Sequence, residues 1–272
     1  MIQKLKRRVI EWLQHEQAAE EQPICDYGRL SYELRLCDVV LIEGRSHVSK
    51  IIQTITKSPW SHAVLYIGRL HDIHNPIMRE KVKSHYSGIL GRQLVIESIL
   101  GEGTIVSPLK KYQDQHLRIC RPKGLTQQDA QKVIESAIGH LGLEYDIRHN
   151  LDLMRLLIPW SALPRRWHSS IFSHHAGIPT KEICSLMISE AFNSVNFPIL
   201  PIIKTDHQKG LKLYHRNPRL YTPRDFDYSP FFEIIKYPII ELSDTAIYQQ
   251  LPWQNAQADE QQPSNDKAQD SE

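Results

Sequence analysis

The sequence predicts an α+β fold in which a mainly antiparallel sheet packs against helices. The chain has 272 residues, of which 41% are hydrophobic and 24% are charged. It is therefore long enough and apolar enough to bury a substantial core. Short apolar segments typical of strands are grouped in its first half, and segments with helical spacing lie between and after them. Strands placed together early, with helices between and after them, favour an α+β domain.

Four segments are predicted to form strands, because each is a short apolar or alternating run. They are residues 37–44 (CDVVLIEG), 62–67 (HAVLYI), 93–99 (QLVIESI) and 116–121 (HLRICR). The third is followed by a predicted turn, GEG, at residues 101–103. Residues 69–92 are polar and contain Pro76 and Gly88, so we expect a long hairpin loop there.

Helices are predicted where apolar residues recur every three or four positions. Residues 48–57 have this spacing, and the Ser58-Pro59 pair should end the helix. Residues 127–142 follow Thr126, which stands at an N-cap position, and Gly142 is the expected stop. A last helix is expected over 181–194, opened by Pro179-Thr180.

The chain is predicted to have three parts. Residues 1–24 form an amphipathic N-terminal helix with a basic face, and residues 25–240 form the folded domain. Residues 241–272 are a polar, acidic tail that we expect to be disordered.

The composition and charge of the chain argue against several classes of function. The net charge is +2 and the bases are dispersed outside the N-terminal helix, so we expect no nucleic-acid partner. There is no run of about 18 apolar residues and no secretory signal pattern at the N-terminus. The four cysteines are scattered without a CxxC pair, which is typical of free thiols in a reducing compartment. We therefore expect a cytoplasmic protein without a cofactor.

Cys184 is the first candidate for chemistry. With Thr180 as N-cap it falls in the first turn of a helix, where unpaired N–H groups and the helix dipole favour a thiolate. A thiolate is the nucleophilic form of cysteine. The alternative is a small buried apolar residue, since free cysteine is among the most buried residue types.

His62 and Glu97 are the candidate partners of this thiol. His62 stands at the first position of an apolar strand, a rigid place at a sheet edge that suits a fixed general base. Glu97 lies inside the apolar segment LVIESIL, where a carboxylate is costly unless it has a partner. Either residue has a plain alternative, as a hydrogen-bonded rim histidine or an outward-facing strand position. Together with Cys184 they match a cysteine–histidine–acid arrangement.

The order of these motifs resembles the permuted papain-fold thiol hydrolases of the NlpC-type superfamily, in particular the YiiX/YebB-like branch. The resemblance covers roughly residues 30–235, and the histidine strand precedes the cysteine helix, the reverse of papain. The matching motifs are Asp38-Val-Val-Leu, the lead-in Thr56, Ser58, Ser61 and His62, then Glu97, Tyr145-Asp146, Cys184-Ser185, and the late Pro223-Arg224-Asp225-Phe226. The segments at 69–92 and 147–178 depart from the family pattern.

The resemblance implies a cysteine hydrolase that cleaves an amide bond in a peptide-like substrate through an acyl-enzyme thioester. His62 would activate Cys184, and Glu97 would hold the imidazole ring. The oxyanion would meet the Cys184 backbone N–H and one side-chain donor. The candidates for that donor are Tyr66, Tyr145 and Ser61.

Two other function classes stay open. Residues 154–170 interleave Trp160 and Trp167 with Arg165 and Arg166, a composition that suits a membrane interface or an acyl-chain site. With the basic residues 1–13, this segment predicts an alternative, a lipid acyl hydrolase or acyltransferase at the inner surface of a membrane. The third class is a non-catalytic binding or scaffold protein. Within it, His174, His175 and Cys184, with His62, are weak zinc candidates because adjacent histidines seldom converge on one metal.

Overall fold

The computed structural model describes residues 8, 10–17, 21–143, 184–206, 210–242 and 245–253. The chain divides into two compact units, Met1–Tyr237 and Pro238–Glu272. The first unit carries the sheet and every element discussed below. The second contains one short 3-10 helix, η6 (Ile247–Gln250).

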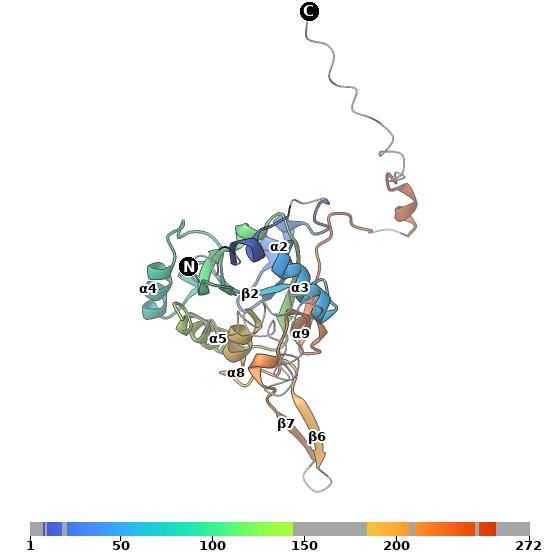
Figure 1. Cartoon of the computed structure of the whole chain (residues 1–272). Helices are drawn as coiled ribbons and strands as arrows, with labels where there is room; N and C mark the ends of the chain where they lie inside the picture. The colour runs from blue at the N-terminus through green and yellow to red at the C-terminus, as the bar shows by residue number, and fades with distance from the viewer. Residues whose placement is uncertain are drawn as a thin grey trace, which may run out of the picture. The chain divides into compact units, whose positions relative to one another are not determined.

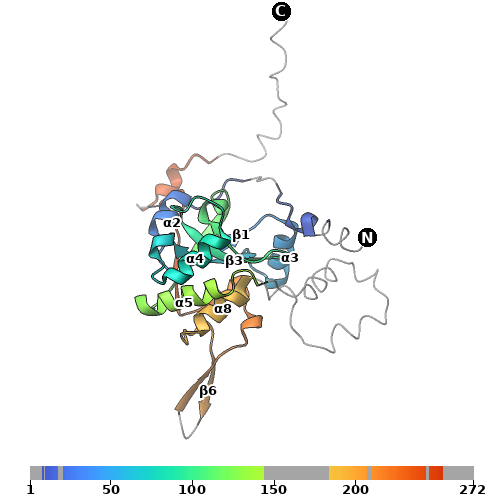
Figure 2. The same ribbon diagram turned by 90° about the vertical axis from the view of Figure 1, so that its left-hand side faces the viewer.

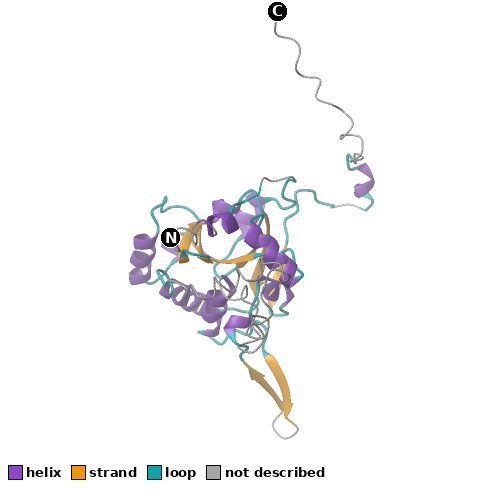
Figure 3. Ribbon diagram, in the orientation of Figure 1, coloured by secondary structure: helices purple, strands orange, loops and turns teal. Residues whose placement is uncertain are grey.

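A six-stranded antiparallel sheet forms the centre of the first unit, with strand order β4-β3-β2-β1-β5-β8 (Figures 1 and 3). Its strands are β1 (Val39–Glu43), β2 (His62–Gly68), β3 (Leu94–Ile99), β4 (Gly103–Pro108), β5 (His116–Pro122) and β8 (Phe232–Ile235). The four predicted strands are β1, β2, β3 and β5, so the α+β class with a mainly antiparallel sheet is confirmed. The two edge strands were not predicted.

Helices lie on both faces of the sheet. They are α2 (Tyr27–Glu33), α3 (His47–Thr56), α4 (Pro76–His85), α5 (Gln127–Gly139), α8 (Cys184–Asn193) and α9 (Pro223–Tyr228). The larger core cluster joins α5 and α8 to one face, where Ala63 and Leu65 of β2 are fully buried. The smaller cluster joins α2 to the other face, which takes the alternate residues Val64 and Tyr66.

The predicted helix ends are confirmed in part: α5 ends at Gly139, three residues before Gly142, and the helix predicted over 1–24 is wrong at residues 15–17 and 21–24, which are not helical. Thr126 caps α5, its side chain accepting a hydrogen bond from the Asp129 N–H. Helix α3 ends at Lys57, which adopts the left-handed conformation one residue before Ser58-Pro59. Helix α8 begins at Cys184, and its expected cap, Thr180, lies outside the described residues.

The prediction of a hairpin loop at 69–92 is wrong. This segment contains a 3-10 helix, η1 (Leu70–Asp72), and the ten-residue helix α4. The Asn75 side chain accepts a hydrogen bond from the Ile77 N–H, and Pro76 occupies the first turn, where its missing N–H costs nothing. A single fully buried residue, Val82, anchors the helix to the core. Because the helix has so narrow an apolar face, the polar composition of the segment led to the prediction of a loop.

The N-terminal segment packs on the first unit. Its described helical turn, residues 10–14, buries Leu13 against Leu100, beside Val48 and Ile51. The Gln14 side-chain amide donates a 2.7 Å hydrogen bond to the Leu100 carbonyl oxygen. These contacts place the segment next to α3 and the end of β3.

Strands β6 (Ile202–Asp206) and β7 (Gly210–Tyr214) form a separate two-stranded hairpin that projects beyond α8 (Figures 1 and 2). Neither strand pairs with the main sheet. In the part of the chain that the structure describes, every helix is too short or too polar to cross a bilayer.

Candidate active site

Cys184 is the first described residue of α8. Helix α8 packs on β2 and β3 across the larger core cluster, with Met187 and Ile188 fully buried. This packing brings the start of the helix to the start of β2. The thiol is buried, with 8% of the residue exposed, and it accepts a backbone hydrogen bond from Ala63.

His62 is the first residue of β2 and hydrogen-bonds the Cys184 thiol. The turn before it is fixed by Ser61, whose hydroxyl accepts a 3.0 Å hydrogen bond from the Gly44 N–H. Trp60, fully buried, adds a second anchor through its indole N–H, 3.3 Å from the Asp227 carboxylate. The imidazole is thus delivered by a rigid segment, as its sequence position predicted.

Glu97 lies on β3 with no exposed side-chain surface, and its carboxylate has four partners. His62 Nε2 lies 2.9 Å from one oxygen, and Lys111 Nζ lies 2.9 Å from the other. The Tyr112 hydroxyl donates to the first oxygen, and Ser107 hydrogen-bonds the group as well. Because Nε2 is engaged with Glu97, Nδ1 is the ring nitrogen that remains for the thiol.

The three groups shift one another's pKa values in the direction of an ion pair. Burial opposes ionisation of all three, but mutual hydrogen bonds and charges prevail. They raise the pKa of His62 to about 9 and lower the pKa of Glu97 to about 2. The pKa of Cys184 is lowered despite burial, chiefly by the hydrogen bond and charge of His62. These shifts favour a thiolate beside an imidazolium.

A cavity of about 360 Å³ opens beside this constellation. Apolar side chains from α3 and β3, including Ile52 and Ile99, form part of its wall. Its polar lining includes Gln14 and Glu16 of the N-terminal segment and Gln115. The Gln115 amide donates a 2.9 Å hydrogen bond to Glu16. The N-terminal segment is thus part of the wall of the cavity that holds Cys184 and His62.

The three side chains predicted as oxyanion donors are placed differently. Ser61 lines the cavity, but its hydroxyl is engaged with Gly44 and with the Ile42 carbonyl oxygen. Tyr66 is not brought to the thiol: it lies farther along β2 in the smaller core cluster, where its hydroxyl accepts from Gln93. Tyr145 lies outside the described residues.

Several other predictions also fall outside the described part of the chain. These are the membrane or acyl-chain candidates Trp160, Trp167, Arg165 and Arg166, and the zinc candidates His174 and His175. Among the described residues, no group of three or more histidines, cysteines and acidic side chains could hold a metal ion.

Lys111 and Tyr112 were missed at the sequence level. They lie on a short 3-10 helix, η2 (Leu109–Tyr112), and both hydrogen-bond the Glu97 carboxylate. A signal existed in the sequence, because a carboxylate inside an apolar strand requires a cationic or hydroxyl partner. Nothing in the linear pattern indicated which of many lysines and tyrosines would supply it.

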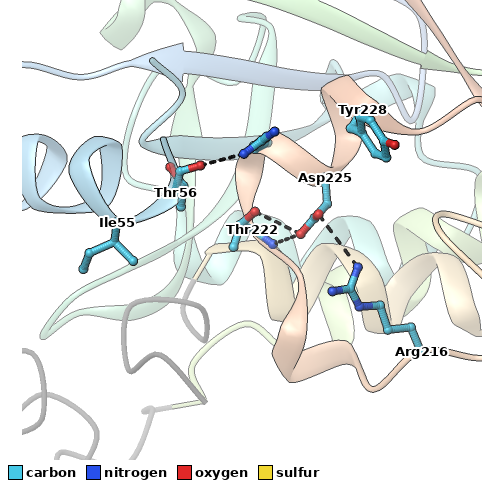
Figure 4. A pocket seen from close by; sticks show the side chains of 7 residues that line it. Ile55, Thr56, Arg216, Thr222, Asp225 and Tyr228 are labelled. Atoms are coloured by element: carbon cyan, nitrogen blue, oxygen red, sulfur yellow. Dashed lines mark hydrogen bonds and ion pairs between the residues drawn. The ribbon is translucent and has the colours of Figure 1, made fainter. Parts of the chain in front are cut away.

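The late motif at residues 223–226 supports the segment before His62. The Arg224 guanidinium donates a 3.0 Å hydrogen bond to the Thr56 carbonyl oxygen, at the end of α3 (Figure 4). Asp225 accepts from both the N–H and the hydroxyl of Thr222, which fixes the start of α9. The second pocket shown there, of about 300 Å³, is lined by these residues and Arg216. Two motifs far apart in sequence thus meet beside the turn that carries the histidine.

Part of the chain matches a known protein family. Residues 33–156 match a family described as permuted papain-like amidase enzymes, the YaeF/YiiX, C92 family. The chain resembles the permuted papain-like amidases. The matched region includes His62 and Glu97 and ends before Cys184. The fold is therefore α+β of the permuted papain-like type, and the chain is a cysteine hydrolase of the amidase class.

Among solved structures, the metalloprotein yiiX from Escherichia coli O157:H7 is similar at 14% sequence identity. The match covers 80% of this chain and 98% of that chain, with a TM-score of 0.44. No curated protein gives a significant match to the sequence.

Proposed function

We propose that this amidase cleaves an amide bond in a peptide-like substrate through a thioester on Cys184, with His62 as general acid and base. The observation that carries the proposal is the buried chain of contacts from the Cys184 thiol through His62 to Glu97, beside an open cavity. The pKa of each of the three groups is shifted in the direction that its role requires.

In the first half-reaction the thiolate attacks the amide carbonyl carbon. The carbonyl π electrons move to oxygen, and the resulting oxyanion lies near the Cys184 backbone N–H. His62, protonated at rest, gives its proton to the amide nitrogen as the carbon–nitrogen bond breaks. The amine leaves and the acyl group stays on sulfur.

In the second half-reaction neutral His62 takes a proton from water, and the hydroxide attacks the thioester carbonyl carbon. The carbon–sulfur bond breaks and the product carboxylic acid dissociates. The thiolate of Cys184 is thereby regenerated beside the imidazolium. Glu97 stays ionised throughout, because its lowered pKa keeps it charged at neutral pH. Its part is to hold the ring and to stabilise the imidazolium.

The composition of the cavity supports a peptide-like substrate. Its lining includes both the polar groups of Gln14, Glu16 and Gln115 and the apolar side chains of Ile52 and Ile99. A peptide unit presents both amide groups and side-chain carbon to such a surface. A long acyl chain would satisfy only the apolar part.

The test combines thiol reactivity with acyl-enzyme trapping. Iodoacetamide alkylation of Cys184, followed across pH by peptide mass spectrometry, should show a midpoint below the free-thiol pKa of about 8.5. A panel of dipeptide p-nitroanilides and of short- and long-chain p-nitrophenyl esters should then add an acyl mass to Cys184. Cys120→Ala is the matched control, because that thiol is buried in the core.

Each result has a distinct meaning. Acylation by p-nitroanilides that His62→Ala abolishes would support the amidase mechanism. Acylation by long-chain esters alone would instead favour the lipid acyl class. A Cys184 thiol that reacts no faster than Cys120, at any pH, would overturn the proposed nucleophile.

A further inference from the structure

The Glu97 carboxylate has a cationic partner on each of its two oxygens. His62 Nε2 lies 2.9 Å from Oε2, and Lys111 Nζ lies 2.9 Å from Oε1. In a cysteine–histidine–acid arrangement, one contact between the carboxylate and the imidazole is enough to orient the ring. The Lys111 ammonium is therefore additional to what the orientation of His62 requires.

Lys111 differs from the neutral partners of Glu97 in charge and in exposure. Tyr112 and Ser107 are buried hydroxyl residues, whereas the Lys111 side chain is 40% exposed and lines the cavity beside Cys184. Its ammonium also lies 5.2 Å from the centre of the Tyr112 ring. Because a partly exposed ammonium keeps part of its hydration, Lys111 brings a charge to Glu97 at a small desolvation cost.

Anionic side chains outnumber cationic ones around His62. The titratable residues that line the cavity together with His62 are Glu16 of the N-terminal segment, Glu97 of β3, Glu102 of the following turn, Lys111 and Tyr112 of η2, and Cys184 of α8. Among these described lining residues, Lys111 is the one lysine or arginine. A neighbouring anion stabilises an imidazolium, and a neighbouring cation destabilises it. Lys111 therefore opposes the carboxylates and the thiolate, and it makes the imidazolium a stronger acid.

We propose that Lys111 is a positioning residue that shares the Glu97 carboxylate with His62 and thereby makes the imidazolium a better proton donor to the leaving nitrogen. This inference rests on the proposed function, in which the His62 proton passes to the amide nitrogen as the carbon–nitrogen bond breaks. Once that proton has left, His62 is neutral, and a buried carboxylate without a cation is costly. Lys111 supplies the remaining cation, so Glu97 keeps an ion-pair partner in the acyl-enzyme.

The test compares two neutral variants, Lys111→Met and Lys111→Gln, with the charge-retaining Lys111→Arg. In both neutral variants, the acidic and alkaline limbs of the kcat/KM profile for a p-nitroanilide should move to higher pH by about half a pH unit, because a neighbouring cation is lost. Cleavage of the p-nitroanilide should slow about two- to threefold, whereas cleavage of the matching p-nitrophenyl ester, whose leaving group needs no proton, should not change. Lys111→Arg should keep both limbs at their wild-type positions.

Lys110→Met is the matched control. Lys110 is the preceding, exposed residue of the same 3-10 helix, so this variant removes the same charge and leaves the four described contacts of Glu97 in place. Its profile should be that of the wild type. The alkylation midpoint of Cys184 needs no substrate, and it should rise in Lys111→Met and Lys111→Gln but not in Lys110→Met.

The direction of the shifts decides between the roles of Lys111. An alkaline limb that moves to lower pH in both neutral variants would overturn the proposal, because Lys111 would then only hold the carboxylate in place. Limbs and a midpoint that keep their wild-type values would overturn it as well. Equal shifts in Lys110→Met would assign the effect to general surface charge and also overturn it. If no p-nitroanilide acylates the wild type, the proposed function fails, and the Cys184 midpoint still measures the charge effect of Lys111 separately.

Discussion

Cys184 and the core cysteines share their burial and differ in everything that surrounds the sulfur. All four cysteines are free thiols and all are buried. Burial raises the pKa of Cys37, whose thiol donates to the Ala130 carbonyl oxygen, and raises that of Cys120 well above its usual range. Cys184 is buried as well, with 8% of the residue exposed, yet its pKa is lowered by His62. Burial makes a thiol inert unless a cation and N–H donors are buried with it.

The position of each thiol relative to the sheet explains the difference between their pKa values. Cys120 lies inside β5 and Cys37 lies just before β1, where neighbouring strands and α5 enclose them with apolar carbon. Cys184 lies where the start of a helix meets the start of β2, next to a cavity. The end of an element offers unpaired backbone groups and space for a reactant, which the middle of a sheet does not. The following variants test this contrast.

Removal of the sulfur should give the largest effect. Cys184→Ala should lower kcat/KM for any amide that the wild type cleaves by about 10³-fold or more, since the nucleophile is lost. Cys120→Ala should leave kcat/KM within about twofold and cost about 1 kcal/mol of stability through a small cavity. Kinetics and thermal unfolding of both variants measure these values. Equal losses of kcat/KM in the two variants would contradict the proposed difference between Cys184 and Cys120.

Removal of the cation should convert Cys184 into a thiol like the others. His62→Ala should lower kcat/KM by about 10²- to 10⁴-fold. It should also move the alkylation midpoint of Cys184 upward, because the imidazolium no longer stabilises the thiolate. In the wild type, activity should rise with pH through the lowered pKa of Cys184. It should fall as the imidazolium is lost around the His62 pKa of about 9.

His116→Ala is the control for this prediction. His116 stacks on Trp60, and burial lowers the pKa of its imidazole, so it cannot supply a cation. An upward shift of the Cys184 midpoint in His116→Ala as well would mean that a general change of packing, not the loss of one cation, is responsible.

The residues around Cys184 show how much of the fold and of the site could be predicted from the sequence. Strand ends, helix caps and the three residues Cys184, His62 and Glu97 follow from local spacing and from the cost of a carboxylate in an apolar strand. The contacts of Lys111 with Glu97 and of Arg224 with Thr56 do not, because they depend on how distant segments pack. Tyr66 illustrates the limit: its strand and spacing suited a donor, but it lies four residues along β2 from His62 and contacts Gln93.

Glu97→Gln should alter stability through its pH dependence. The folded-state pKa of Glu97 is about 2, below the unfolded value of 4.5, so its stabilisation is present above pH 4.5 and is lost as pH falls toward 2. For a shift of this size the loss is roughly 3 kcal/mol. The variant should lack that part of the acid slope in urea unfolding at a series of pH values. An unchanged slope, equal to that of the surface variant Glu80→Gln, would show that Glu97 is not held ionised.

Tyr112→Phe should have a smaller effect, because it removes one of four partners of Glu97. Loss of a hydrogen bond to a charged group costs about 1.5–3 kcal/mol. We expect kcat to fall about tenfold or less, with KM unchanged. We also expect the alkaline limb of the pH profile to shift to lower pH, because a less constrained carboxylate stabilises the imidazolium less. A fall in stability without any change in the pH profile would restrict Tyr112 to packing.

The smallest expected effect concerns access to the thiol. Gln14 and Glu16 form part of the cavity wall, and Leu13 holds their segment against Leu100. Leu13→Ser should release the segment and raise the alkylation rate of Cys184 by about threefold, as local opening of one weakly held element would. The rates at Cys37 and Cys120 should not change, because both lie in the larger core cluster, which contains none of the described residues of that segment. If all three rates rise together, the variant has loosened the whole domain, and the N-terminal segment is a support of the fold and not a wall of the site.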